Sequence, residues 1–284
     1  MEKYTSKMRT VGKLCLIPVS GLLILAIGAA VLFGIAIGIL WIQDRRLEHI
    51  AKTVIDVEAE TYIQENYPDN DFVIEDAFYV FKDNCYRVKI QSPSSQDTHF
   101  HLDYDYKSLE LVTDSYQTDV IEGWNTFHRI SEEYGIWIHG LLEEMPELGS
   151  VEVGLRKASK SDSDSSAGLA VDKLVPDGVY DVAEIGTAYG FVKADFLVSG
   201  ENVHIQHAME LLLEMDSFLQ GRYEVMEITL QDKPYPDTSV EFYIYDVTRE
   251  DLFCDEPLTA LQAKWEEQEA KREALRKKWQ SEDG

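Results

Sequence analysis

Two histidines that alternate along a predicted strand are the side chains in this sequence best placed for chemistry. His99 and His101 are separated by one residue, so their rings would project from one face of the strand, which Asp103 shares. Imidazoles and a carboxylate placed in this way can chelate a transition metal, but they equally suit the solvated face of a half-buried strand. His204 and His207, one helical turn apart, are open to the same two interpretations. We predict no metal site and no cofactor.

A run of acidic and hydroxyl side chains resembles the start of a calcium-binding loop. Asp162, Asp164 and Ser166 alternate as the first ligands of an EF-hand do. That loop also needs glycine at its sixth position and glutamate at its twelfth, where this chain has Ala167 and Lys173. The segment is therefore predicted to be a polar surface loop.

Signatures of known enzyme chemistries are absent from the sequence. It contains no G-x-S-x-G, no P-loop, no H-E-x-x-H and no G-x-G-x-x-G. Adjacent carboxylates such as Glu132-Glu133 and Glu143-Glu144 arise by chance among 52 acidic residues, so they do not indicate acid–base catalysis. We predict that the protein is not an enzyme; a hydrolase whose site is assembled in space is the alternative.

The net charge narrows the classes of partner. The 284 residues include 52 acidic and 26 basic side chains, which give a formal net charge of −26. This excess argues against nucleic acid, because binding phosphates requires lysine and arginine to replace counterions. It favours solubility and cationic partners.

Cysteine usage indicates neither a zinc knuckle nor a redox motif. The three cysteines, Cys15, Cys85 and Cys254, include no C-x-x-C pair. Cys85 and Cys254 fall in the same predicted soluble part. They could form a disulfide, or each could serve as a small buried apolar residue, and both interpretations stay open.

A long uncharged segment near the N-terminus predicts a transmembrane helix. Residues 14–42 contain no charged side chain, and about 20 apolar residues suffice to cross a bilayer core. A cleaved signal peptide would have a shorter apolar core that ends at a small-residue site, such as the one at Ala26 to Gly28. Because the apolar run continues well beyond that site, we predict an uncleaved signal-anchor.

Basic residues around this segment predict its orientation. Four precede the predicted span and two follow it: Lys3, Lys7, Arg9 and Lys13 before it, and Arg45 and Arg46 after it. The positive-inside rule therefore predicts that residues 1–13 are cytoplasmic and that the C-terminal part is extracytoplasmic. The expected location is the cell membrane, which the chain crosses once.

Small residues recur at every fourth position in the predicted span. Ala26, Ala30, Gly34 and Gly38 would form one ridge on which two helix backbones could approach closely. The pattern suggests a homodimer through the transmembrane helix, although glycine and alanine are also common in membrane helices generally. These four residues are the predicted interaction residues.

Residues 43–146 are predicted to form a first αβ domain. A helix from about Arg45 to Asn66 precedes short runs in which apolar and polar residues alternate. The predicted strands are 72–81, 85–91, 98–104 and 109–113, and a second helix covers 116–145. Helices on one face of this meander would bury its apolar side.

Residues 147–255 are predicted to form a second αβ domain of similar size. Strands are expected at 150–158 and 190–199, a helix at 202–219, and a hairpin of strands at 223–230 and 239–247. The predicted fold class is thus α+β, with one transmembrane helix followed by two small units, each a helix plus an antiparallel meander.

A long charged helix is predicted at residues 256–284. Apolar residues at its heptad positions could form a coiled-coil seam, but Gln268 and Arg272 interrupt it. The alternative is a solvated helix held by ion pairs such as that of Glu267 with Lys271.

Short motifs in the first half resemble the YfjL-like family of single-pass extracytoplasmic bacterial proteins. The motifs are Tyr62 to Pro68, Phe78-Tyr79, Tyr86-Arg87-Val88, and Asp114-Ser115-Tyr116 at the start of the next helix. With the basic N-terminus and the apolar segment, the resemblance covers about residues 1–145. It implies a small αβ domain, similar to PepSY-type modules, and it brings no established activity and no catalytic residue.

These features predict a membrane-anchored extracytoplasmic binding or interaction module for a protein partner of unknown identity. Acidic αβ domains that are rich in aromatic residues and lack a reactive cluster favour this function. A hydrolase with an unrecognised site and a structural dimer-forming surface protein are the alternatives.

Overall fold

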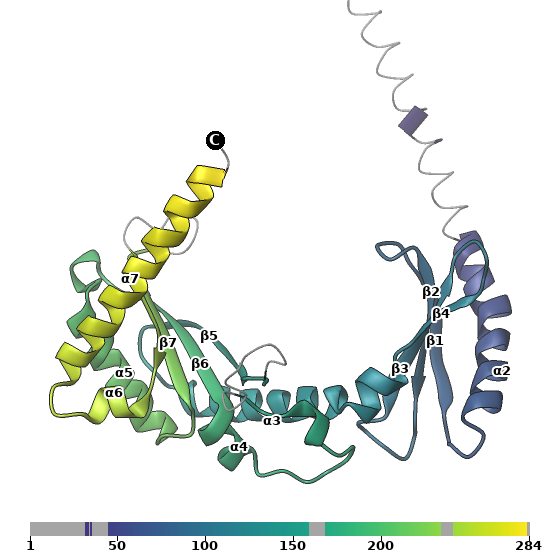
Figure 1. Ribbon diagram of the computed structural model, residues 1–284, viewed down its shortest axis with the longest axis horizontal. Helices are drawn as coiled ribbons and strands as arrows, with labels where there is room; N and C mark the ends of the chain where they lie inside the picture. The colour runs from purple at the N-terminus through teal and green to yellow at the C-terminus, as the bar shows by residue number, and fades with distance from the viewer. Residues whose placement is uncertain (1–31, 34, 36–44, 159–167, 234–240, 283–284) are drawn as a thin grey trace, which may run out of the picture. The chain divides into compact units, whose positions relative to one another are not determined.

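The computed structural model divides into two compact units (Figure 1). It describes residues 32–33, 35, 45–158, 168–233 and 241–282. The first unit contains the described residues up to Pro93 together with Phe100–Asp114, and the second contains Ser94–His99 and the chain from Ser115. Each unit pairs one four-stranded sheet with helices, so the fold is a mixed α+β fold with two sheets.

The first unit is a β-meander with a helix beside it (Figure 1). Its strands follow one another in the order β1-β2-β3-β4, and the pairs β1/β2 and β3/β4 are antiparallel. Helical residues from position 45 continue through a π-helical turn, η1, into α2. The bounds are η1 Ala51–Ile55, α2 Asp56–Asn66, β1 Val73–Val80, β2 Cys85–Gln91, β3 His99–Asp105 and β4 Leu111–Asp114.

Alternation along the strands decides which face of this sheet is buried. Tyr86, Val88 and Ile90 of β2 are at most 1% exposed, whereas the residues between them are accessible to solvent. Ala59 and Ile63 of α2 are buried as well, so the apolar face of the sheet is the one that faces the helix. Burying each large apolar side chain contributes about 1.5–3 kcal/mol.

The second unit is a mixed four-stranded sheet packed against helices. The strand order is β5-β6-β7-β8; β6 and β7 are parallel, and the two outer pairs are antiparallel. The strands are β5 Leu148–Leu155, β6 Gly190–Leu197, β7 Val225–Gln231 and β8 Glu241–Val247. The helices are η2 Gln117–Ile121, α3 Trp124–Leu142, η3 Val171–Lys173, α4 Val182–Tyr189, η4 Gly200–Asn202, α5 Ile205–Leu219, α6 Arg249–Phe253 and α7 Pro257–Glu282.

The parallel pair corrects the antiparallel meander predicted for this unit. A meander requires every strand to reverse direction relative to the strand before it, but α5 lies between β6 and β7 in the chain. The 15 residues of α5 return the chain to the end of the sheet at which β6 began. Strand β7 therefore runs parallel to β6.

Helix α3 belongs to the second unit. Its apolar stripe of Ile130, Tyr134, Ile138 and Leu142 is at most 1% exposed and lies in one core with side chains of β6, β7, β8 and α5. The predicted boundary at residue 146 therefore differs from the division of the structure, in which the main chain enters the second unit at Ser115. Gly135 does not interrupt the helix.

The N-terminal element of the predicted fold class is corrected by the structure. Among the residues that the structure describes, no helix is both long enough and apolar enough to cross a membrane. The long helices α3 and α7, of 19 and 26 residues, both carry acidic and basic side chains. Apart from positions 32, 33 and 35, the predicted span at 14–42 lies outside the described residues, and so do residues 1–13. The described fold is α+β without a transmembrane helix.

Candidate functional site

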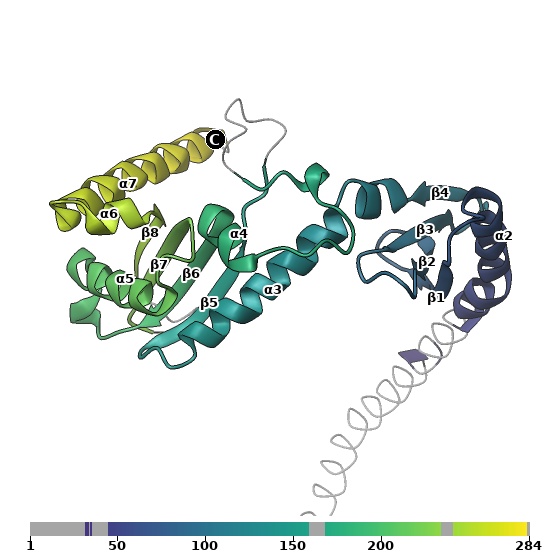
Figure 2. The ribbon, with the colours of Figure 1, turned by 90° about the horizontal axis from the view of Figure 1, so that it is seen from below.

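Helix α7 covers the edge strand β8 and bonds its backbone (Figure 2). Gln268 donates from Nε2 to the carbonyl oxygen of Tyr245 (2.6 Å) and accepts the Tyr245 N–H at Oε1 (3.1 Å). Arg272 donates to the carbonyl oxygen of Tyr243 (3.1 Å). These bonds occupy edge groups that would otherwise be available to pair with another strand.

The same contact explains the residues that interrupt the predicted heptad pattern of α7. Gln268 is only 5% exposed, because it lies against β8. Trp265 stacks on Phe242 of β8 with ring centroids 5.6 Å apart, and Leu261 is buried. The first half of α7 is therefore a cover for the sheet edge, and its polar positions serve that contact.

At the opposite edge of the sheet, α3 lies along β5 (Figure 2). Ser131 accepts the Leu155 N–H at Oγ (3.2 Å), whereas the next amide, that of Arg156, donates to the carbonyl oxygen of Tyr189 before β6 (2.7 Å). Backbone groups of an antiparallel strand alternate between its two sides. The N–H and C=O groups of Val153, two residues before Leu155, therefore face α3 and not β6.

Two adjoining hollows lie between α3 and β5, and together they form what we name the α3–β5 groove. Their volumes are about 440 and 390 Å³, and they share His139. Between residues 128 and 143 a helix rises about 22 Å, the length of roughly seven extended residues. The lining residues are His128, Ser131, Glu132, Gly135, Ile136, His139, Gly140, Leu142, Glu143, Met145, Leu148, Val151 and Val153.

One stripe of α3 forms the outer wall of the groove. His128, Glu132, Ile136, His139 and Glu143 follow one another at spacings of three or four residues, and all five are exposed. Ile136 is 68% exposed. The wall thus has an apolar centre, imidazoles on either side of it, and two carboxylates.

Two glycines within α3 widen the groove. A methyl group built on Gly135 would lie 4.0 Å from the carbonyl oxygen of Val153, and one built on Gly140 would meet no atom within 4 Å. Steric crowding therefore does not require glycine at either position. A glycine in the interior of a helix costs about 0.5–1 kcal/mol relative to alanine. The helix tolerates two destabilising residues where it lines the groove.

Alanine at either of these glycines is expected to stabilise the protein. Gly135→Ala and Gly140→Ala should each raise the free energy of unfolding, measured by urea denaturation, by about 0.5–1 kcal/mol. Gly149→Ala, outside a helix and with its methyl group 3.1 Å from the Asp195 carbonyl oxygen, is the control for which no gain is expected. A loss of stability in both α3 variants would instead assign the two glycines to packing.

A buried ion pair fixes the first half of α3. Asp97 is 1% exposed and accepts two hydrogen bonds from Arg129, Nε to Oδ1 at 2.7 Å and Nη2 to Oδ2 at 3.0 Å. The Asp177 N–H also donates to Asp97 (2.8 Å), and Arg129 donates to the carbonyl oxygen of Gly178 (2.9 Å). The pair thus joins α3 to two loops of the second unit.

The electrostatics of this pair are those of a structural clamp. Burial alone would raise the pKa of Asp97, but hydrogen bonds from Arg129 and from the Asp177 N–H outweigh it and hold that pKa below its usual value. The same carboxylate raises the pKa of Arg129. A catalytic acid or base needs a pKa near the working pH, and these shifts move both groups away from it.

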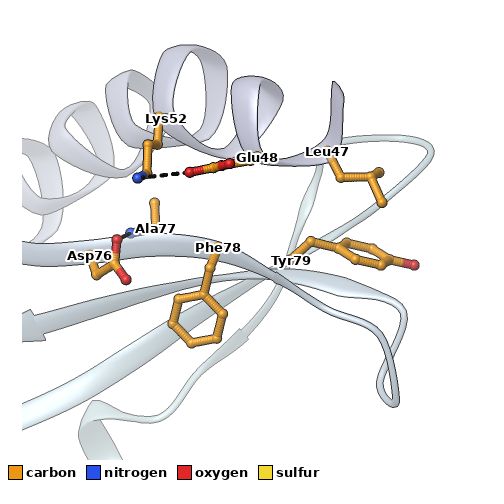
Figure 3. Close-up of a pocket in the computed structure, with 7 residues that line it drawn as sticks. All are labelled: Leu47, Glu48, Lys52, Asp76, Ala77, Phe78 and Tyr79. Atoms are coloured by element: carbon orange, nitrogen blue, oxygen red, sulfur yellow. Dashed lines mark hydrogen bonds and ion pairs between the residues drawn. The ribbon is translucent and has the colours of Figure 1, made fainter. Parts of the chain in front are cut away.

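A smaller hollow lies in the first unit between the N-terminal helical residues and β1 (Figure 3). Its volume is about 270 Å³. Lys52 extends toward Glu48, with which it forms an ion pair (3.2 Å), and Asp76 accepts the Ala77 N–H (2.9 Å). The remaining lining residues are Leu47, Phe78 and Tyr79. The polar groups of this hollow are thus an ion pair within one helix and a carboxylate bonded to the next residue of its own strand.

The histidines singled out in the sequence have other neighbours. His101 lies 3.7 Å from Asp103, whose carboxylate accepts two hydrogen bonds from Arg87 (2.8 and 2.7 Å). The His99 ring lies 3.3 Å from the carbonyl oxygen of Gln96. Over the described part of the chain, no three histidine, cysteine, aspartate or glutamate residues come together as metal ligands would.

The second histidine pair marks the start of α5. Nδ1 of His204 accepts the His207 N–H (3.2 Å), which caps the helix. The ring of His207 lies 3.2 Å from Glu210 and 3.7 Å from Glu147. His204 therefore caps the start of α5, and His207 lies beside two carboxylates in its first turns.

The remaining residues named in the sequence analysis are two cysteines, the acidic run and the predicted interaction residues. Cys85 is buried and Cys254 is exposed, and both are free thiols. Burial raises the pKa of the Cys85 thiol. The acidic run at 162–166 lies outside the described residues, and so do the predicted interaction residues Ala26, Ala30, Gly34 and Gly38.

Sequence reasoning missed the α3–β5 groove, although one signal for it was present. The stripe from His128 to Glu143 recurs at helical spacing beside the apolar stripe of α3, with Gly135 and Gly140 next to it. That pattern marks a second face of the helix, which is exposed. It does not reveal that β5 is an edge strand lying along that face, which depends on the strand order.

Motif residues of the first unit converge on one carboxylate. Tyr62 and Tyr67 both donate to Oδ2 of Asp114, over 2.9 and 2.6 Å. Burial, together with the hydrogen bond to Asp114, raises the pKa of Tyr62 to about 12. The ring of Tyr67 also contacts those of Phe72 and Phe100, with centroids 5.4 and 5.8 Å apart. The motif therefore fastens the end of α2 to the end of β4.

Comparison with known proteins bears on this first unit. Among solved structures, a DUF5037 family protein from Ruminococcus gnavus ATCC 29149 is 13% identical, with 75% of this chain and 99% of that chain covered and a TM-score of 0.22. That similarity carries no argument about fold or function. No curated protein matches the chain. Residues 24–115 match the YfjL-like, N-terminal domain family. This match confirms the family resemblance of the motifs, and it covers all four strands of the first unit.

Proposed function

We propose that this protein is a protein-binding module, that its second unit makes the contact through the α3–β5 groove, and that no chemical step is involved. The observation that carries the proposal is the difference between the two sheet edges. Side chains of α7 bond both the N–H and the C=O group of Tyr245 in β8. At the β5 edge, Ser131 of α3 bonds the Leu155 N–H, but beside the carbonyl oxygen of Val153 the helix has Gly135 and no side chain. Edge groups left without side-chain partners attract other polypeptides.

The composition of the groove supports a protein partner. Ile136 is 68% exposed, and polar and acidic side chains surround it, which is the pattern of an interface with an apolar centre and a polar rim. The groove is also long and shallow. A small-molecule site usually encloses most of its ligand, so this shape suits an elongated polypeptide segment better than a compact metabolite.

Site-specific photocrosslinking tests the proposal. With p-benzoylphenylalanine in place of Ile136, ultraviolet irradiation of cells that naturally make the protein is expected to give a covalent adduct with a second protein. The matched control carries the same probe in place of Val179, which is 100% exposed but lies outside the groove. Adducts of equal yield from both positions, or none from Ile136, would show that the groove is not the contact surface.

A further inference from the structure

We infer that the occupant of the α3–β5 groove is an extended polypeptide segment in which cationic and apolar side chains alternate. This inference rests on the proposed function and names the chemistry of the partner. It follows from three properties of the groove: its length, its charge, and the backbone groups at its floor.

The shape of the groove requires an extended segment. Its wall from His128 to Glu143 is about as long as seven extended residues. Side chains of an extended segment alternate between two sides, so every second one can turn toward the apolar centre at Ile136. A helix of the same length would be about 10 Å wide, too bulky for two hollows this shallow.

The charge of the groove selects a cationic partner. Glu132 and Glu143 are exposed on its wall, and the lining residues include no lysine and no arginine. The whole chain carries a net charge of −26, which attracts a cationic segment from a distance. A second copy is the wrong partner, because two grooves docked face to face would oppose Glu132 and Glu143 to the same residues.

The floor of the groove offers a hydrogen-bond acceptor. The carbonyl oxygen of Val153 faces α3 at Gly135, where the helix has no side chain to meet it. A backbone N–H or an ammonium group of the partner can donate to this oxygen. Bulk at position 135 should therefore weaken binding even though the helix itself accommodates it.

Synthetic octapeptides test the inference on the full chain. One, acetylated and amidated, alternates lysine and valine; the second replaces lysine by glutamate, and the third replaces valine by serine. Fluorescence anisotropy of the labelled peptides is expected to show binding of the lysine–valine peptide alone. Its affinity should fall steeply with added salt, because exposed charge pairs are screened. Equal binding of the glutamate peptide, or no binding of any peptide, would overturn the inference.

Matched variants locate the binding. The double variant Glu132→Gln/Glu143→Gln should bind the lysine–valine peptide about tenfold more weakly, since two exposed ion pairs are lost. Glu201→Gln/Glu256→Gln changes the net charge equally, with both residues exposed and outside the groove, and should bind as the wild type does. Ile136→Ser and Gly135→Leu should each weaken binding as well. If the two double variants bind equally, the peptide is attracted by net charge alone and the inference is wrong.

The outcomes separate this inference from the proposed function. A specific adduct at Ile136 together with failure of the lysine–valine peptide would leave the binding module standing and overturn the cationic partner. If neither the adduct at Ile136 nor binding of the lysine–valine peptide is seen, the proposed function and the inference are both overturned. Sedimentation of the wild type and of Ile136→Ser supplies the remaining comparison: a dimer that dissociates in the variant would assign the groove to a second copy.

Discussion

Replacing Arg129 by methionine is expected to lower the free energy of unfolding by about 3–5 kcal/mol, because the change leaves a buried carboxylate without its cation. Asp97, whose side chain is 1% exposed, accepts two of the hydrogen bonds that Arg129 donates. Urea denaturation followed by tryptophan fluorescence measures the loss.

The matched control removes both charges of the pair. Asp97→Asn/Arg129→Met should be more stable than Arg129→Met alone, because no ionised group is then buried and the asparagine can still accept the Asp177 N–H. A single variant that loses less than about 1 kcal/mol would contradict the clamp as described, because breaking such a pair costs several times that. A double variant less stable than the single one would contradict it too.

The same pair predicts a dependence on pH. In the wild type the folded-state pKa of Asp97 lies below its unfolded value of about 3.9, so the stabilisation is complete above that pH and is lost as pH falls through the folded pKa. In Arg129→Met, burial would instead raise the folded-state pKa of Asp97. Protonation of Asp97 then removes the buried, unpaired charge that destabilises the variant. The cost of the substitution should therefore begin to shrink at a pH above the unfolded value of about 3.9, as pH falls through the raised pKa of the variant.

The second large effect is expected at Gln268. Gln268→Leu removes both hydrogen bonds to the backbone of Tyr245 and leaves its N–H and C=O groups covered by α7 without partners. Each such group costs about 1–3 kcal/mol, so the free energy of unfolding should fall by about 2–4 kcal/mol. Opening of the β8 edge should also promote self-association, visible as light scattering on mild heating.

A second glutamine of the same helix provides the control. Gln262 bonds Glu266 at an exposed position, so Gln262→Leu should change stability by less than about 0.5 kcal/mol. If both glutamine variants behave alike, then α7 does not cap the sheet edge, and the contrast between the two edges that supports the proposed function disappears.

Local patterns in the sequence predicted the elements of this fold well. Alternation over Cys85–Gln91 predicted β2 with its observed bounds, because a strand with one buried face shows its period within a few residues. The charged helix predicted at residues 256–284 is also observed, and it spans Pro257–Glu282. The parallel pairing of β6 with β7 is not local, and neither is the packing of α3 into the second core.

The functional features depend even more on distant parts of the chain. Arg129 lies 32 residues from Asp97, and Asp177 lies 80 residues from Asp97. No short sequence motif could therefore predict this buried ion pair. Gln268 read as an interruption of a heptad pattern because its partner, Tyr245, belongs to a strand 23 residues earlier. In both cases the partner of a polar side chain lies far from it in the sequence.

Helix α3 connects the clamp with the proposed binding surface. Arg129 is held on one side of the helix, and the neighbouring His128 begins the wall of the α3–β5 groove. A rigid first half of α3 keeps that wall at a constant distance from β5, which favours binding because little ordering is left to occur. The two destabilising glycines of the helix are thus compatible with a well-defined groove.

Amide hydrogen exchange, with and without the lysine–valine octapeptide, tests the central claim most directly. On adding peptide, we expect slower exchange along residues 128–143 of α3 and at Val151 and Val153 of β5, with little change in α7 and in the first unit. Glu132→Gln/Glu143→Gln should abolish this protection, and Glu201→Gln/Glu256→Gln should not. Protection that appears in α7 or in the first unit, while α3 and β5 exchange as before, would contradict the assignment of the α3–β5 groove as the binding surface.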